Sequence, residues 1–234
     1  MQMRFHIVTL FPEVIEAYTG ASILGRAQKD KKLEVKTYQL RDFVDMPKGL
    51  KKGEWFYKRA DDKPYGGGPG MVLQAQPILK AVEKIWKAKP SSKKTKVILT
   101  SAGGKPFTNA YAKKLAKEKD VVIVCGRYEG LDSRVKKVLK AQKISVEEVS
   151  VGPYILTGGE VPALAIIDAT ARQIEGVLGK FESLEESRIA SHEIYTRPEV
   201  IKYKGKSYKV PKILLSGHRA KIEEWKGRKG HSTR

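Results

Sequence analysis

"DVVIVCGRYEG", residues 120–130, joins a short β-branched apolar run to a turn that contains two glycines. Such a run is typical of a buried strand, and the glycines indicate a tight loop at its carboxyl end. Similar runs alternate along the chain with segments whose apolar residues repeat with a helical period. Strands are predicted at residues 4–11, 33–40, 96–101, 120–128 and 144–152, and helices at 76–89, 109–119, 133–142 and 159–174. This alternation predicts an α/β fold with a parallel sheet.

Three of the predicted strands end in glycine-bearing loops: "SAGGKPF" (101–107), "CGRYEG" (125–130) and "VGPYILTGGEVP" (151–162). In open parallel sheets, ligands bind beyond the carboxyl ends of the strands, and glycine lets backbone approach a flat ligand closely. We therefore expect the three loops to converge on one pocket. The sequence lacks the phosphate-loop pattern GxxxxGK[ST], and with four histidines and one cysteine no dedicated transition-metal site is expected.

The charge of the chain points to a polyanionic partner. Its 234 residues include 46 Lys and Arg against 26 Asp and Glu, a formal net charge of +20. No apolar run approaches the roughly 20 residues of a membrane-spanning helix, so nucleic acid is favoured over a membrane. A solvated, lysine-rich surface of a heat-adapted protein is the alternative reading. The single cysteine, Cys125, is predicted to be a buried core thiol and fits a reducing cytoplasm.

The sequence changes character after residue 179. Residues 180–191 are polar with no sustained apolar period, which is typical of a linker. Residues 192–234 are basic, end in a predicted helix and are too few to bury a large core alone. We therefore expect a first domain of residues 1–179, a linker of residues 180–191 and a small, mainly helical C-terminal domain of residues 192–234.

Four motifs occur in the order "PYGGGPGMV", "CGRYEG", "LTGGE" and "YTRP". In this order and spacing they resemble the bacterial tRNA (guanine-N1)-methyltransferase family, and the resemblance runs from "FPEV" (11–14) to Trp225. It implies a SPOUT-type parallel sheet with a deep trefoil knot, in which the three loops bind S-adenosylmethionine. It also implies that residues 61–72 lie beside the catalytic pocket. The implied cofactor-binding residues are Ser101, Gly103, Gly126, Tyr128, Glu129, Val151, Gly152, Pro153, Tyr154, Ile155, Leu156, Gly158, Gly159 and Pro162.

Methylation at N1 of guanine needs a base, because N1 carries a proton, and a cation to hold the charge that develops on O6. The resemblance assigns the cationic role to Arg172. It places an aspartate as base in the linker, where this chain reads "LEESRIAS". An ungapped count reaches Ser187, and a shift of one residue places Glu186 there. Glu186 is the predicted base and Glu185 the weaker candidate, while the alternative is that both are only solvated acids.

The resemblance implies S-adenosylmethionine-dependent methylation of N1 of guanine 37 in tRNA, next to the anticodon. The enzyme would be a cytoplasmic homodimer with its active site at the subunit interface, and basic residues of the C-terminal domain would bind tRNA phosphates. Activity is also expected to depend on Mg²⁺, held by either the protein or the RNA. Two alternatives stay open: another SPOUT methyltransferase acting on ribosomal RNA or a ribose 2′-hydroxyl, and a non-catalytic RNA-binding protein with this fold.

Overall fold

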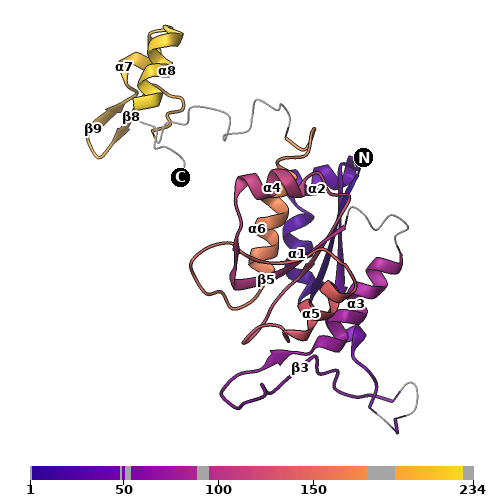
Figure 1. Cartoon of the computed structure of the whole chain (residues 1–234). Helices are drawn as coiled ribbons and strands as arrows, with labels where there is room; N and C mark the ends of the chain where they lie inside the picture. Colours follow the sequence, from indigo (N-terminus) through magenta and orange to yellow (C-terminus); the bar gives the residue numbers. More distant parts are fainter. Residues whose placement is uncertain (1, 48, 51–53, 89–94, 179–192, 229–234) are drawn as a thin grey trace. The chain divides into compact units, whose positions relative to one another are not determined.

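The computed structural model of the protein describes residues 2–47, 49–50, 54–88, 95–178 and 193–228. It divides into two compact units, Met1–Val177 and Leu178–Arg234. The first unit is an α/β domain built on one five-stranded parallel sheet, and the second is a small mixed unit (Figure 1). Each unit is described by itself below.

The sheet of the first unit has the strand order β2-β1-β6-β5-β7. Its strands are β1 (Met3–Thr9), β2 (Leu33–Gln39), β5 (Thr95–Pro106), β6 (Asp120–Val124) and β7 (Val146–Ser150). All adjacent pairs are parallel, as the sequence predicts. The central strand β6 is buried along its whole length. Its continuous β-branched run fits this position, because a strand covered on both faces has no polar side to present.

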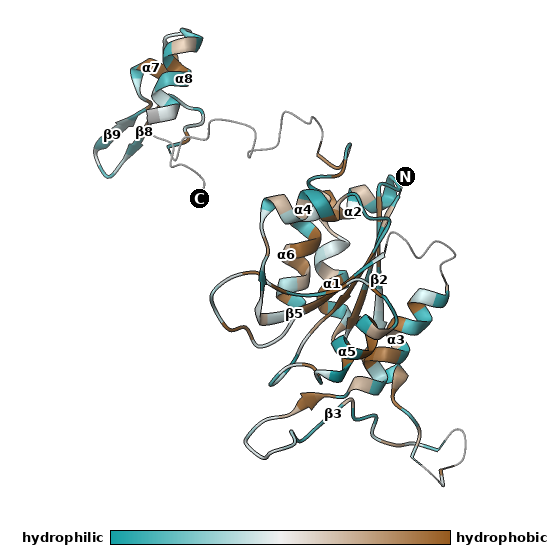
Figure 2. Cartoon of the chain, viewed as in Figure 1, coloured by the Kyte–Doolittle hydropathy of each residue, from teal (hydrophilic) through white to brown (hydrophobic). Residues whose placement is uncertain are grey.

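Helices cover both faces of the sheet. One face packs against α1 (Pro12–Thr19), α2 (Ser22–Lys29), α4 (Asn109–Leu115) and α6 (Glu160–Ala171). The other packs against α3 (Ala75–Lys87), α5 (Arg134–Ala141) and the 3₁₀ helix η1 (Leu40–Phe43). Hydrophobic residues accordingly concentrate in the central strands, α6 and α3 (Figure 2). Fully buried side chains such as Phe5 and Ile166 on the first face, and Ile78 on the second, each contribute roughly 2 kcal/mol.

The five predicted strands and four predicted helices are all present, with shifted ends. Helices α1 and α2 were not predicted, and neither was the short ribbon of β3 (Asp61–Asp62) and β4 (Val72–Leu73). The two helices have eight residues each, which leaves little room for a helical repeat to show in the sequence. Cys125 is a buried free thiol, as predicted, and its burial raises its pKa well above the ordinary value.

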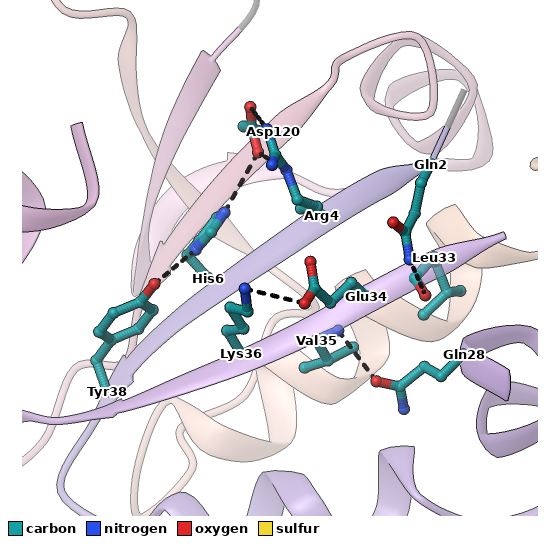
Figure 3. Close-up of polar contacts among 10 residues, drawn as sticks. All are labelled: Gln2, Arg4, His6, Gln28, Leu33, Glu34, Val35, Lys36, Tyr38 and Asp120. Atoms are coloured by element: carbon teal, nitrogen blue, oxygen red, sulfur yellow. Dashed lines mark hydrogen bonds and ion pairs between the residues drawn. The ribbon is translucent and has the colours of Figure 1, made fainter. Parts of the chain in front are cut away.

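A polar cluster across β2, β1 and β6 centres on Asp120, the first residue of β6 (Figure 3). Asp120 accepts hydrogen bonds from both Nε and Nη2 of Arg4, at 2.8 Å and 3.1 Å. The ring of His6 lies between this carboxylate and Tyr38, with Nε2 3.3 Å from Asp120 and Nδ1 3.0 Å from the phenol oxygen. These partners compensate the burial of a carboxylate that is 0% exposed.

The second unit combines a hairpin with two helices. Strands β8 (Val200–Tyr203) and β9 (Lys206–Lys209) are antiparallel, and α7 (Lys212–Leu215) and α8 (Arg219–Arg228) follow. The expectation of a mainly helical unit is therefore incomplete, although the final helix is present. Lys204 and Gly205 form the two-residue turn, and both have positive φ, which is typical of tight hairpins. The residues of β8 and β9 are almost all exposed. The sequence therefore has no alternation of apolar and polar residues there from which the strands could be predicted.

Candidate active site

A cavity of about 450 Å³ lies at the carboxyl ends of β5, β6 and β7. Its walls come from the three glycine-bearing loops, at residues 99–103, 126–133, 148–152 and 154–159, from Lys136 of α5 and from Pro162 in the first turn of α6. The loops meet because parallel strands present their carboxyl ends at one edge of the sheet. The predicted convergence of the three loops is therefore confirmed.

The first loop arises from an irregularity in β5. Thr100 and Lys105 both pair with Val149 of β7, so the four residues between them leave the ladder. Gly104 lies against β7, where an added Cβ would sit 2.6 Å from the backbone nitrogen of Val149. By contrast, a Cβ on Gly103 would have no heavy atom of the described residues within 4 Å. The bulge thus pushes Ser101, Ala102 and Gly103 out to line the cavity.

The second and third loops touch at glycines. The backbone N–H of Gly159 donates to the carbonyl of Gly126 at 2.7 Å, and the N–H of Gly126 donates to the hydroxyl of Thr100 at 2.9 Å. A Cβ on Gly159 would lie 2.1 Å from that hydroxyl oxygen and 2.5 Å from the nitrogen of Gly126. The sequence needs glycine here because three backbone segments pass within contact of one another.

The lining includes thirteen of the fourteen residues that the sequence analysis assigned to cofactor binding. Pro153 is the one assigned residue that is not among the described residues lining the cavity. The exposed side chains of Tyr128, Tyr154, Ile155 and Leu156 supply apolar surface, with Ile155 89% exposed. Backbone amides and carbonyls of the glycine loops supply hydrogen-bonding groups around them. A cavity with this mixture suits a ligand that has a flat apolar part and a polar tail.

Tyr128 has a left-handed backbone, with φ of 57°. For a bulky residue this conformation costs roughly 1–2 kcal/mol, and such costs cluster at ligand sites. It turns the second loop so that the next residue, Glu129, bonds through its N–H to the carbonyl of Met71 at 3.0 Å. The second loop is thereby joined to the "PYGGGPG" segment.

The "PYGGGPG" segment adjoins the second loop of the cavity. Its glycines at 66, 67, 68 and 70 all have positive φ, which explains the concentration of glycine there. A Cβ on Gly70 would lie 2.4 Å from a carboxylate oxygen of Glu129. Further along, Leu73 donates to the carbonyl of Gly130 at 3.0 Å and accepts from Asp132 at 3.0 Å. The segment therefore supports one wall of the site without lining it, as far as the described residues show.

Charged residues that the sequence analysis did not assign also line the cavity: Arg127, Asp132, Lys136 and Glu148. Lys136 pairs with Glu148 at 3.1 Å, and Asp132 pairs with Arg134 at 2.6 Å. The ion pair with Arg134 lowers the pKa of the Asp132 carboxyl. Asp132 and Lys136 are charged residues shortly after the "CGRYEG" loop, and this was the feature of the sequence from which the wall could have been predicted.

Of the two predicted catalytic residues, only Arg172 lies within the described residues, and it does not line this cavity. Arg172 caps the carboxyl end of α6, whose amino end lies at the cavity, and is not among the described lining residues. Twelve helical residues separate the two ends by about 18 Å. Glu186 and Glu185, together with Ser187, lie outside the described residues.

Two further searches cover the described ranges only. They contain no group of three or more His, Cys, Asp or Glu side chains that could hold a metal ion. None of the helices in these ranges combines the length and the apolar character that a membrane span requires.

Comparison with known proteins gives a consistent picture. Residues 3–234 match the model of a family described as "tRNA (Guanine-1)-methyltransferase TrmD". A "tRNA (guanine-N(1)-)-methyltransferase" of Desulforamulus reducens is 43% identical over 230 residues, 97% of this chain and 83% of the relative. Proteins with the same name from Ruminiclostridium cellulolyticum and Caldicellulosiruptor saccharolyticus are 40% and 41% identical, covering 96% of this chain and 89% and 84% of their own lengths.

Proposed function

The chain belongs to the tRNA (guanine-1)-methyltransferase family and methylates N1 of guanine in tRNA, and we propose that its target is guanine 37, next to the anticodon. We further propose that S-adenosylmethionine is the methyl donor and that it binds in the cavity formed by the three loops. The observation that carries the cofactor proposal is the convergence of these loops, with their glycines, on one 450 Å³ cavity.

The residues present fit this cofactor. Backbone groups around Gly103, Gly126, Gly152 and Gly158 would hold its polar parts, and Tyr154, Ile155 and Leu156 would cover its adenine ring. When bound, S-adenosylmethionine supplies an electrophilic methyl group. The protein must present guanine N1 to that group without its proton, which requires a base and a cation near O6. We assign the base to Glu186 and the cation to Arg172.

Arg172 lies about one helix length from the cavity of its own chain, so this assignment needs a second chain. We propose that the working unit is a homodimer in which Arg172 of one chain serves the cavity of the other. Exposed apolar side chains on neighbouring helices support such an interface. Val14 and Tyr18 of α1 and Val161 of α6 are exposed, and Tyr18 donates to Asp168 of α6 at 2.8 Å. Ile155 and Leu156 are exposed at the cavity itself, and Val161 is next to the lining residue Pro162, so exposed apolar side chains also lie beside the cavity.

We propose that the C-terminal region binds the tRNA. The second unit carries exposed basic residues that could neutralise phosphates: Lys202, Lys204, Lys206, Lys209, Lys212, Arg219 and Lys226. Phosphate contacts of this kind make affinity fall as salt rises. The division into a domain of residues 1–179, a linker of residues 180–191 and a tRNA-binding domain of residues 192–234 is part of the same proposal.

The trefoil knot is likewise proposed, with the third loop threaded against the second. The close approach of Gly159 to Gly126 and Thr100 supports it, since threaded segments must pass at backbone contact distance. Threaded chains are rare, so the proposal rests on the family and on these contacts together.

The test is methyl transfer from labelled S-adenosylmethionine to a tRNA transcript with guanine at positions 36 and 37, with the product nucleoside identified by chromatography. Wild type should yield 1-methylguanosine at position 37. Glu186→Gln should lose about 10²–10⁴-fold in rate, the contribution of a general base. Ser187→Ala is the matched control beside it and should keep most of the rate. Parallel reactions with and without Mg²⁺ measure the metal dependence.

Two outcomes would contradict the proposal in different ways. Methylation of another nucleotide, or of a ribose hydroxyl, would keep the enzyme but change its target. Wild-type rates in Glu186→Gln with loss in Ser187→Ala would move the assignment by one residue and remove the carboxylate base.

A further inference from the structure

A buried carboxylate joins the second and third loops of the cavity to the end of β1. Glu160 is the first residue of α6 and is 2% exposed. Its Oε1 accepts a hydrogen bond from the hydroxyl of Thr9 at 2.6 Å. Its Oε2 accepts from Nε of Arg127 at 3.1 Å, and Nη2 of the same guanidinium lies 3.1 Å away. The free N–H groups at the start of α6 also favour a negative charge there.

The hydroxyl of Thr9 connects Glu160 to the backbone that follows β1. It accepts the backbone N–H of Phe11 at 3.0 Å and donates its own proton to Glu160 at 2.6 Å. The Phe11 ring in turn lies under Arg127, with the guanidinium carbon 4.4 Å from the ring centroid. Thr9 therefore orients the carboxylate, while the phenyl ring and the carboxylate together orient the guanidinium.

Arg127 connects the second loop to the third. It belongs to the second loop, and its Nη1 donates to the carbonyl of Thr157 in the third loop at 3.3 Å. Its backbone pairs with Gly158 across an antiparallel bridge. A Cβ on Gly158 would lie 2.3 Å from Nε of Arg127 and 2.6 Å from Oε2 of Glu160. The ion pair thus fills the space beside the third loop.

We propose that Glu160, oriented by Thr9, is a positioning residue that holds Arg127 and so fixes the spacing of the two loops before the cofactor binds. Arg127 lines the cavity, whereas Thr9 and Glu160 are not among the described residues that line it. They therefore act on the ligand through Arg127. The inference rests on the proposed function, because it assigns the effect to S-adenosylmethionine binding. A preformed cavity binds more tightly, since the cost of ordering the loops is already met.

The chain contains a matched control at the other end of β6. Asp120 is 0% exposed and pairs with Arg4 at 2.8 Å, as Glu160 is buried and pairs with Arg127. Asp120 begins β6 at the end of the strand away from the cavity, and Arg127 follows the opposite end. Asp120→Asn therefore removes a comparable buried ion pair without touching the loops.

The experiment compares full-length wild type, Glu160→Gln, Thr9→Val, Thr9→Ser and Asp120→Asn. Circular dichroism first establishes a temperature at which every variant is folded, and calorimetry then gives the dissociation constant of S-adenosylmethionine. We expect Glu160→Gln and Thr9→Val to weaken binding about tenfold, the equivalent of one unmet buried hydrogen bond. Thr9→Ser restores the hydroxyl and should bind like wild type. Asp120→Asn should lower the melting temperature with affinity unchanged.

Steady-state kinetics supply a second readout. In Glu160→Gln the KM for S-adenosylmethionine should rise, while kcat at saturating cofactor stays within about threefold, because the lost interaction orders the empty site. Wild-type affinity in folded Glu160→Gln and Thr9→Val would overturn the inference and leave the pair purely structural. An equal loss of affinity in Asp120→Asn would overturn it as well, by showing a general effect of destabilisation. A wild-type chain that binds no S-adenosylmethionine would instead overturn the proposed cofactor site, and this inference with it.

Discussion

At the scale of single residues, the site depends on glycines that differ sharply in the space around them. Gly159 has ordinary φ, so alanine there adds no backbone strain, but its Cβ would lie 2.1 Å from Thr100 and 2.5 Å from Gly126. Gly159→Ala should therefore lower the free energy of unfolding by about 1–3 kcal/mol, the usual cost of overpacking. Urea unfolding followed by circular dichroism measures it.

Gly103→Ala is the matched control, because Gly103 lines the same cavity and an added Cβ there would have open space around it. Its unfolding free energy should change by less than about 0.5 kcal/mol. Equal stability of the two variants would show that the second and third loops can separate freely, against the close contacts of Gly159.

At the scale of elements, Glu147 ties three of them together. From β7 it accepts hydrogen bonds from Lys96 of β5 at 2.5 Å and from Tyr111 of α4 at 2.6 Å. The bond from Lys96, followed by that from Tyr111, lowers the pKa of Glu147. Its stabilising contribution is complete above the unfolded-state pKa of about 4.3 and disappears as pH falls through the lower folded-state pKa. Wild type should thus exceed Glu147→Gln in unfolding free energy at pH 7, and this difference should vanish on acidification.

Glu83→Gln provides the comparison for that pH series. Glu83 pairs with Lys87 at 2.6 Å on the surface of α3, where both side chains are more than half exposed. Exposed ion pairs contribute about 0–1 kcal/mol, so Glu83→Gln should change the free energy of unfolding only slightly at every pH of the series. If the difference in unfolding free energy between wild type and Glu147→Gln persisted unchanged to pH 3, the Glu147 side chain would act by packing and not by charge.

At the scale of the whole molecule, the position of Arg172 makes a prediction about subunits. If Arg172 serves the cavity of a partner, Arg172→Ala and a variant with a blocked cavity should complement each other. Gly103→Trp, once shown to be folded and unable to bind S-adenosylmethionine, supplies the blocked cavity. Heterodimers purified with two different tags should methylate tRNA although neither parent homodimer does, since one intact combination remains in each heterodimer.

Two results would contradict the prediction that Arg172 serves the cavity of a partner. Inactive heterodimers would place Arg172 in the site of its own chain, which would require a rearrangement of α6, or would remove it from catalysis. A monomer with full activity in sedimentation analysis would contradict the shared site directly.

Much of this protein can be predicted from the sequence. The β-branched runs determine the strands, the helical periods determine four of the covering helices, and a strand buried on both faces, such as β6, needs only local composition to be recognised. The three loops could be assigned to one cavity because the carboxyl ends of parallel strands meet at one edge. Their glycines and the "YTRP" motif led to the family, and hence to the reaction on guanine.

Other features were decided by tertiary structure alone. The hydrogen bonds from Thr9 and Arg127 to Glu160 span 151 and 33 positions of the sequence, and they depend on the order β1-β6-β5-β7, which no local pattern encodes. A buried carboxylate looks the same in sequence as an exposed one, because only the folded surroundings determine whether it meets an arginine or water. For the same reason the sequence could name Arg172, but only the length and direction of α6 reveal that it lies far from the cavity of its own chain.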